Sequence, residues 1–358
     1  MSIPTEPIGS IPRRRELLDA IEASHGDTSD PALAPFYEAA VRDTLAQFEA
    51  TGSPVITDGE QRKYHNFFTY CVHGASNMSA DGFTIPFAAG HTRRMPRLNA
   101  KPFRYRRYAD RYLEYAQQFT RTPLKQAVIS PSALSLLYPP EPIADYSREQ
   151  FIDDLLSEHV TEVRRCLQRG AVSVQVDFTE GRLAMKIDPT GSLLSRFVEL
   201  NNLGLAPLSH AERLHMGVHT CPGGDRDSTH SADVDYAELL PSLFTLNVTK
   251  FYVALAGEAD PEYVLRLIRD RIKLHQTVFV GVTSPIDPRV ETSEEVRDRV
   301  LQAAAYIPIE QLGTTDDCGF SPFSDDTSTS RETAFSKVRA RIEGTALAAK
   351  ELGLARGA

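Results

Sequence analysis

A histidine and a cysteine two positions apart are the residues of this chain whose types and spacing most clearly suggest chemistry. They are His219 and Cys221, in the segment "GVHTCPGGDRDSTH" at 217–230. On a β-strand, residues two apart point to the same face, so both side chains could approach one ion. Imidazole nitrogen and thiolate sulfur are common ligands of zinc. A single histidine and cysteine at this spacing are also compatible with ordinary packing. A metal site is therefore indicated only if a further ligand is present.

Cys318, in the segment "GTTDDCGF", is the further candidate ligand. It follows an apolar stretch that is predicted as a strand, and His219 and Cys221 lie at the end of another. One histidine and two cysteines leave the fourth position of a tetrahedral zinc ion open, which is typical of catalytic zinc. Bound zinc would also lower the pKa of an incoming substrate thiol. The three residues therefore predict a zinc centre that activates a thiol.

The elements that must position these residues are predicted from alternating apolar and amphipathic stretches. The amphipathic stretches carry helix signals, such as the cap Ser147 with the closing Gly170, and Thr292 at the start of a later helix. The predicted strands span 5–11, 54–59, 126–130, 173–178, 215–220, 250–255, 277–283 and 312–315. Strand and helix repeated eight times predict an α/β fold, a single (β/α)8 TIM barrel that spans 1–358 as one catalytic domain.

An open, doubly wound sheet would show the same alternation of strands and helices. Its nucleotide-binding version is disfavoured, because no Gly-x-Gly-x-x-Gly follows a strand and no Walker loop is present. In a barrel, active-site side chains lie at the carboxyl ends of the strands. Seven of the eight predicted strand ends carry side chains capable of binding or acid–base chemistry. Among them, Asp177 and Glu180 are the candidate catalytic residues.

One long segment, 61–107, interrupts this pattern after the second predicted strand. It is rich in glycine, proline, asparagine and aromatic residues, and loops of this length are usually functional. In a barrel the segment would leave from the catalytic face and extend over it. We expect either a lid that attracts an anionic substrate or a solvated basic flap. Its basic residues are Arg93, Arg94, Arg97, Lys101, Arg104, Arg106 and Arg107.

The bulk properties of the 358 residues narrow the classes of function. A formal net charge of −9 argues against a nucleic-acid or membrane-surface protein, because phosphate binding requires a basic face. No apolar run of about 18 residues is present, so no membrane span is expected. The four cysteines are too few for a disulfide framework, and the first twenty residues lack the apolar region of a secretory signal. We therefore expect a cytoplasmic enzyme of small-molecule substrates with free thiols, with homo-oligomerisation left open.

Together, these motifs resemble the catalytic C-terminal barrel of cobalamin-independent methionine synthase over nearly the whole chain. "PTEPIGSIPR" is similar to the family's opening strand, which implies that the backbone at Ile8 and the Ser10 hydroxyl hold a substrate carboxylate. Asp58 and Glu60 of "DGE", together with Asp177, resemble the positions that hold the substrate amino group. "HTC" and "DDCG" resemble the family's zinc-binding motifs. The resemblance implies a TIM barrel, a zinc ion, a thiol acceptor and a methyl-folate donor.

The chain departs from that family at two positions. The family's zinc-binding glutamate aligns with Ala254, and its proposed acid histidine aligns with Ile286. We expect water to fill the fourth zinc position, with Glu258 and His230 as the alternative ligands. Short relatives of the family include epoxyalkane:coenzyme M transferase, in which zinc activates a thiol that attacks an epoxide carbon.

The leading hypothesis is a zinc-dependent methyl- or alkyltransferase that activates a thiol, with a methyl-folate or another electrophile as donor. Epoxide:thiol transfer or a lyase reaction is the alternative among enzymes. A non-catalytic metal-binding barrel is the alternative from a different class, and the missing glutamate and histidine favour it. The many polar strand ends argue against it, because a purely structural barrel has no use for them.

Overall fold

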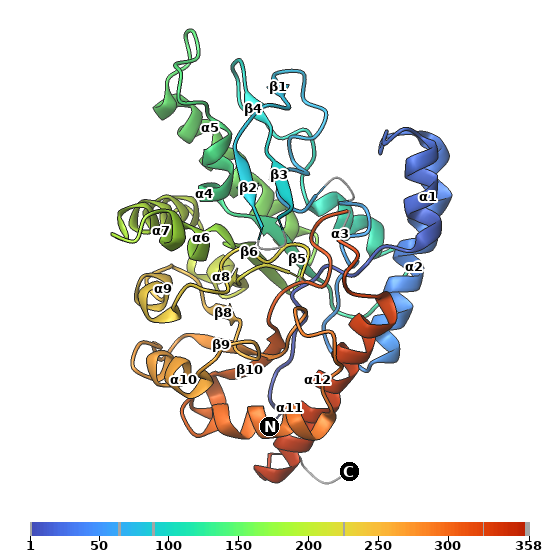
Figure 1. Cartoon of the computed structure of the whole chain (residues 1–358), viewed down its shortest axis with the longest axis vertical. Coiled ribbons are helices and arrows are strands. Elements are labelled where there is room, and N and C mark those ends of the chain that lie inside the picture. Colours follow the sequence, from blue (N-terminus) through green and yellow to red (C-terminus); the bar gives the residue numbers. More distant parts are fainter. Residues whose placement is uncertain (1, 64–65, 88–89, 225, 325, 355–358) are drawn as a thin grey trace.

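The chain folds around a parallel sheet of six strands flanked by helices (Figure 1). This computed structural model describes residues 2–63, 66–87, 90–224, 226–324 and 326–354. The strands are hydrogen-bonded in chain order, and nearly all of their residues are buried, which explains why they read as apolar runs. They are β5 (Lys125–Ile129), β6 (Ser173–Asp177), β7 (Met216–Thr220), β8 (Lys250–Val253), β9 (Thr277–Thr283) and β10 (Leu312–Asp316).

Six of the eight predicted strands are therefore confirmed, and the other two are wrong as extended strands. The segments 5–11 and 54–59 each make a single isolated parallel bridge, through Thr5 to β10 and through Ile56 to the residue before β5. Prolines stand in or beside both segments. Because proline has no amide hydrogen for a ladder, these residues prevent continuous pairing with the sheet edges.

Polar contacts hold the N-terminal segment against the sheet where a continuous ladder is missing. The Glu6 amide donates to the carbonyl of Thr314 at 3.1 Å. The Glu6 carboxylate pairs with Lys250 at 2.7 Å, and the Lys125 ammonium group donates to the carbonyl of Pro7 at 2.7 Å. These contacts join the segment to the edge strand β10 and also to β5 and β8, so side chains from several strands hold it in place.

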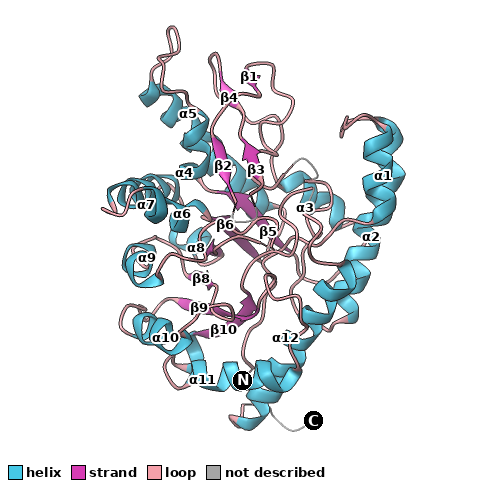
Figure 2. Cartoon of the chain, in the orientation of Figure 1, coloured by secondary structure: helices cyan, strands magenta, loops and turns pink. Residues whose placement is uncertain are grey.

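The helices lie outside the strands (Figure 2), and two predicted helix caps are confirmed. The side chains of Ser147 and Thr292 each accept a hydrogen bond from the third helical residue, within a capping box. In the described part of the chain, no helix is both long and apolar enough to cross a membrane. The helices are α1 (Arg15–Ala23), α2 (Ala34–Ala50), α3 (Asp110–Ala116), α4 (Pro131–Leu134), α5 (Arg148–Gln168), α6 (Glu180–Ile187), α7 (Ser192–Leu205), α8 (His210–Arg213), α9 (Tyr236–Leu243), α10 (Pro261–Arg269), α11 (Ser293–Ala304) and α12 (Arg331–Glu351), with short 3-10 helices at Pro31–Leu33, Ser135–Leu137 and Ile309–Gln311.

The excursion at 61–107 contains two small antiparallel sheets. One pairs β1 (Met78–Ser79) with β4 (Arg97–Leu98), and the other pairs β2 (Thr84–Pro86) with β3 (Thr92–Arg94). In the view of Figure 1, both lie above β5 and β6. Residues 64, 65, 88 and 89 of the excursion lie outside the described part.

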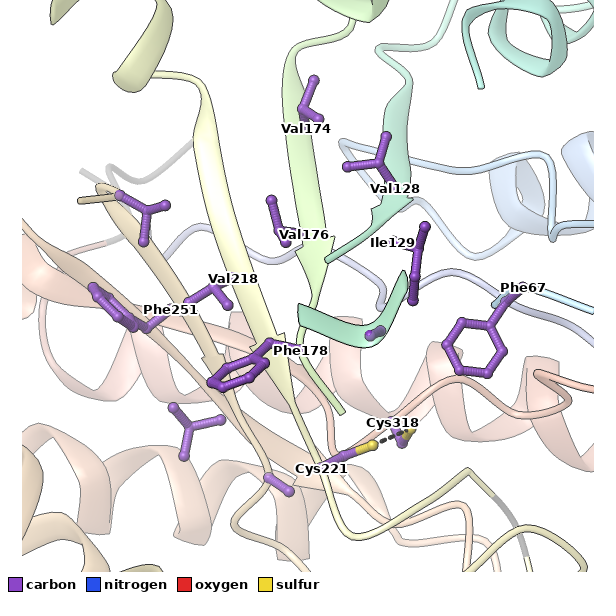
Figure 3. Packing of buried hydrophobic residues seen from close by; sticks show 14 of the residues in the cluster. Phe67, Val128, Ile129, Val174, Val176, Phe178, Val218, Cys221, Phe251 and Cys318 are labelled. Atoms are coloured by element: carbon purple, nitrogen blue, oxygen red, sulfur yellow. Dashed lines mark hydrogen bonds between the residues drawn. The ribbon is translucent and has the colours of Figure 1, made fainter. Parts of the chain in front are cut away.

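The hydrophobic core runs through the strands towards the two cysteines of the predicted zinc centre. Figure 3 shows Val128, Val174 and Val218 on the neighbouring strands β5, β6 and β7, and each is at most 2% exposed. Branched side chains of this kind suit a strand that is buried on both faces. Cys221 and Cys318 lie at the end of this packed region, with their sulfur atoms facing each other. The predicted ligands are thus built onto the core itself.

Arg341 of α12 supports a stability prediction, because it binds the end of β10 from within the core. Its guanidinium pairs with Asp316 and donates to the carbonyl of Glu6, and the paired side chains are at most 1% exposed. Arg341→Met leaves the Asp316 carboxylate buried without its partner. We expect the free energy of unfolding, measured in urea, to fall by about 3–5 kcal/mol.

Arg339→Met is the matched control, because Arg339 lies on the same helix but is exposed. It should change the free energy of unfolding by no more than about 0.5 kcal/mol. Equal effects of the two substitutions would contradict a stabilising role for the buried pair.

Candidate functional site

The structure brings the three predicted metal ligands together. One ligand atom from each of His219, Cys221 and Cys318 lies within 4.8 Å of the other two, and all three residues are buried. The two sulfur atoms are 2.6 Å apart, and both cysteines are free thiols. His219 lies in β7, Cys221 follows that strand directly, and Cys318 follows β10 by two residues. The predicted convergence of two distant strand ends is therefore present.

The orientation of His219 leaves one ring nitrogen available for a ligand. Its Nδ1 lies 3.3 Å from the carbonyl oxygen of Tyr252, which can only accept, so Nδ1 carries the proton. Its Nε2 is buried and makes no hydrogen bond of normal geometry. Leaving such an atom unsatisfied costs about 1–3 kcal/mol. A histidine held through Nδ1 with a bare Nε2 is the usual arrangement of a metal ligand, so the residues present fit a zinc ion.

The charges of the two thiols differ. Burial raises the pKa of both, but at Cys221 the hydrogen bond from Cys318 and the charge of His219 outweigh burial and bring the pKa well below its usual range. At Cys318, burial and the neighbouring Cys221 thiolate together raise the pKa well above that range. Burial lowers the pKa of His219, but the Cys221 thiolate outweighs it, so the pKa is raised. These directions favour the thiolate at Cys221 over the thiolate at Cys318, and a metal bound to both sulfur atoms would displace the remaining proton.

The two alternative fourth ligands do not join the three residues. Glu258 forms an ion pair with Arg182 at 2.7 Å. His230 lines the same cavity as the cysteines, but its Nδ1 bonds to the Ser231 hydroxyl at 2.8 Å. Burial lowers the pKa of His230 to about 4. Ala254 is buried after β8 and offers no ligand atom, so no carboxylate of the described residues completes the group.

A cavity in front of the cysteines collects most of the residues predicted to bind substrate. Ile8, Ser10, Glu60 and Asp177 line it, as does the candidate catalytic residue Glu180. Asp58 does not line it. Its carboxylate instead accepts the amide of Glu60 at 2.9 Å and so shapes the turn that presents Glu60 to the cavity.

Ser10 reaches the cavity because the residue next to Cys318 is a glycine. A Cβ atom on Gly319 would lie 2.2 Å from the Ser10 hydroxyl oxygen. That oxygen accepts a hydrogen bond from the Ser321 amide at 3.2 Å. The close approach joins the N-terminal segment to the loop that carries the third ligand. A side chain at 319 would push the two apart.

Glu60 is paired with a lysine that the sequence reasoning missed. The Lys63 ammonium group lies 3.1 Å from the Glu60 carboxylate, and both side chains are nearly fully buried. It also donates to the carbonyl of Ala127 at 2.8 Å, the third-last residue of β5. The spacing of three positions between Glu60 and Lys63 is the signal that could have found this pair.

Asp177 and Glu180 are both buried, and each has its own partners. Asp177 accepts a hydrogen bond from Gln175 at 2.7 Å, while burial and the Glu60 charge raise its pKa to about 6. One Glu180 oxygen accepts hydrogen bonds from the hydroxyls of Ser130 and Ser132, and the other is buried without a partner. Burial raises the pKa of Glu180 to about 7. The two serines stand at a predicted polar strand end, but the sequence did not indicate that they hold Glu180.

The excursion contributes aromatic rather than basic side chains to the cavity. None of its seven basic residues lines the cavity. Arg93, Arg97 and Arg104 instead pair with the carboxylates of Asp326, Asp81 and Asp154, respectively. Its cavity-lining residues are Phe67, Phe68, Phe83, Ile85 and Phe87.

Comparison with known proteins gives a match over most of the chain. Residues 3–340 match the family described as "Cobalamin-independent synthase, Catalytic domain". The methionine synthase of Sulfurisphaera tokodaii is 23% identical over 359 residues, covering 98% of this chain and 94% of that protein. A 5-methyltetrahydropteroyltriglutamate–homocysteine methyltransferase of Nitratidesulfovibrio vulgaris is 25% identical, covering 89% of this chain but 39% of that longer protein.

Solved structures of the same kind share the fold. A B12-independent methionine synthase from Shewanella sp. W3-18-1, in complex with selenomethionine, superposes with a TM-score of 0.75 at 18% identity, covering 99% of this chain and 100% of that chain. A putative vitamin-B12-independent methionine synthase from Listeria monocytogenes gives a TM-score of 0.67 at 18% identity, covering 97% and 98%. On the match over residues 3–340, the chain belongs to the cobalamin-independent methionine synthase family of methyltransferases.

Proposed function

We propose that this protein transfers a methyl or other alkyl group to a thiol at a zinc ion held by His219, Cys221 and Cys318. The observation that carries the proposal is the buried convergence of their ligand atoms within 4.8 Å, with His219 Nε2 making no hydrogen bond of normal geometry. Zinc bound there would hold an acceptor thiol as its thiolate at neutral pH. The cavity in front of the group is where an acceptor and a donor would meet.

The polar wall of the cavity would orient the acceptor. Glu60 and Asp177 suit a substrate ammonium group, while the Ile8 backbone and the Ser10 hydroxyl suit a carboxylate. An amino-acid thiol carries both groups, and one relative is named for homocysteine and a methyl-folate donor. Fixing the sulfur in line with the donor carbon can contribute about 7–11 kcal/mol to lowering the barrier. We therefore propose a homocysteine-like acceptor and a methyl-folate donor.

Glu180 would act as the acid. The two serine hydroxyls donate to one of its oxygens, so the proton of the neutral carboxyl resides on the other, unpartnered oxygen in the cavity wall. The leaving nitrogen of a folate, or the ring oxygen of an epoxide, needs a proton as its bond to carbon breaks. Glu180 would supply it and so replace the histidine that the family has where this chain has Ile286.

A second candidate reaction is transfer from an apolar electrophile such as an epoxide. The phenylalanines of the excursion favour it, because they give the donor side of the cavity an apolar wall. A panel of donors incubated with a panel of thiols separates the two reactions. Consumption of methyl-folate with homocysteine supports the first, and ring opening of an epoxide supports the second. Consumption of no donor by the zinc-loaded protein would favour a non-catalytic metal-binding protein.

The architecture expected of this family would complete the site. We propose that 5–11 and 54–59 close the six strands into an eight-stranded barrel, supported by their bridges and by the bond from the Ile11 amide to the Gly59 carbonyl at 3.0 Å. We also propose that 61–107 acts as a lid over the catalytic face. The cavity encloses about 60 Å³, whereas ligand pockets usually span about 300–1,000 Å³, so its aromatic wall would have to move to admit both substrates.

The metal assignment predicts about one zinc per chain in the purified protein. Cys221→Ser combined with Cys318→Ser removes both sulfur ligands, so zinc measured by elemental analysis should be lost. Circular dichroism should still show a folded protein. Cys166→Ala is the matched control, because Cys166 is buried in α5 away from the cavity, and it should retain zinc. Full zinc occupancy in the double variant would contradict the assignment.

The role of Glu180 predicts a pH dependence. Its folded pKa of about 7 is raised above the usual value, so the proton is present below pH 7 and is lost as the pH rises through 7. We expect the single-turnover rate of alkyl transfer to decline above about pH 7 for the same reason. Glu180→Gln should lower this rate by about 10²–10⁴-fold and abolish the decline.

Glu162→Gln is the matched control for the pH profile. Burial raises the pKa of Glu162 to about 7 as well, but this residue does not line the cavity. Its variant should keep the alkaline decline of the wild-type protein. If Glu180→Gln keeps the decline too, another group donates the proton.

A further inference from the structure

A second hollow lies outside the cavity described above and is rich in arginine. It consists of two adjoining hollows of about 650 and 180 Å³ that share Arg62, Arg106, Arg107 and Tyr112. The larger one also includes Arg111, the second residue of α3. We name the combined surface the arginine groove. Arg111 and Tyr112 of its lining belong to α3, which packs against α2 and α5 and is labelled in Figure 1.

The positive charge of the arginine groove is not balanced by the protein. Arg111 pairs with Glu114 at 2.7 Å. Among residues 2–63, 66–87, 90–224, 226–324 and 326–354, no ion pair joins Arg62, Arg106 or Arg107 to a carboxylate. Glu114 is the one acidic residue that lines the groove in that part of the chain. Since the whole chain carries a net charge of −9, three uncompensated arginines in one hollow create a local field of opposite sign.

The three arginines are held in place by contacts that leave donors available. The Arg62 guanidinium lies 4.0 Å from the ring centre of Tyr115. Arg106 donates to the carbonyl of Gly74, and Arg107 bonds to the Tyr112 hydroxyl. Each guanidinium has five N–H donors in a fixed plane, so these contacts use only part of its capacity. Arginines fixed in this way suit bidentate binding of phosphate or carboxylate, because little side-chain entropy is lost on binding.

The floor of the groove adjoins the wall of the active-site cavity. Lys63 lines the smaller hollow, and its ammonium group pairs with Glu60. Glu60 in turn lines the cavity in front of the cysteines. The ammonium group also lies 4.5 Å from the ring centre of Tyr70, which lines the groove as well. One buried ion pair therefore separates the groove from the cavity.

We propose that the arginine groove binds a small oligoanionic ligand, in which two or three phosphate or carboxylate groups engage Arg62, Arg106 and Arg107. A ligand with several anionic groups fits better than a single ion, because three guanidinium groups line one continuous hollow. The proposal does not depend on the reaction at the zinc centre. The ligand is distinguished from a nucleic acid by the small extent of the groove and the acidic character of the rest of the chain.

Calorimetric titration of the full chain with tripolyphosphate and, separately, with a triglutamate peptide tests the proposal. We expect saturable one-to-one binding of at least one probe. The Arg106→Ala and Arg107→Ala double variant should bind that probe at least about tenfold more weakly, because it loses charge-assisted hydrogen bonds. Binding by the wild-type protein should weaken as salt is added, since part of the attraction is screened.

Arg196→Ala combined with Arg271→Ala is the matched control. Both residues are exposed and lie outside the groove, so the variant changes the net charge equally. It should bind within about twofold of the wild-type protein, because neither residue lines the groove and exposed charges are screened by salt. Arg62→Gln is a second groove variant in case the double variant unfolds on a thermal melt, and it should also weaken binding.

The relative affinity of the two probes identifies the anionic group of the ligand, and the two kinds of variant test whether the groove binds it. Tighter binding of tripolyphosphate assigns a phosphate-bearing ligand, and tighter binding of triglutamate assigns a polycarboxylate. Equal weakening in the groove and control variants would mean that only net charge matters and would overturn the proposal. So would the absence of saturable binding of either probe.

Discussion

The strong curvature of the parallel sheet is the constraint on which the candidate site depends. β7 and β10 are separated by two strands, and in a flat sheet their axes would lie about 14 Å apart. The thiols that follow them are nevertheless 2.6 Å apart. Curvature thus brings separate strand ends together around one cavity. The convergence of the metal ligands and of the cavity-lining carboxylates depends on it. The buried pair of Arg341 with Asp316 matters here because it fixes the end of β10, two residues before Cys318.

Burial gives neighbouring carboxyl groups in this cavity different properties. Glu60 has Lys63 as a buried partner, while Glu180 has only two hydroxyl donors, and burial raises the pKa of Glu180. The two glutamates can then take different roles, one electrostatic and one proton-donating, because their surroundings differ. The same principle acts on the cysteines, where one thiol stabilises the thiolate of the other.

The sequence predicted those parts of the protein that depend on local patterns. The buried strands and the same-face spacing of His219 and Cys221 are of this kind, and the structure contains both. The segments 5–11 and 54–59 are not, because they are attached through residues far away in the chain, such as Lys250 for the first and Lys125 for the second. Glu258 shows the same limit. It is the acid nearest to the expected ligand position in sequence, but Arg182, 76 positions away, pairs with it. The partners of Glu180 were missed for the same reason.

The N-terminal segment lines the cavity although no continuous strand pairing holds it in place. It supplies Ile8 and Ser10 to the cavity, yet an isolated bridge and side-chain contacts hold it instead of a continuous strand ladder. Such a segment can open at a lower free energy than the six-stranded sheet, so its amide hydrogens exchange with solvent sooner than those of β6 to β9. Part of the binding energy of any molecule that contacts Ile8 or Ser10 is then spent on ordering the segment. Affinity at this end of the cavity therefore depends on how well the first dozen residues of the chain are already ordered before the molecule arrives.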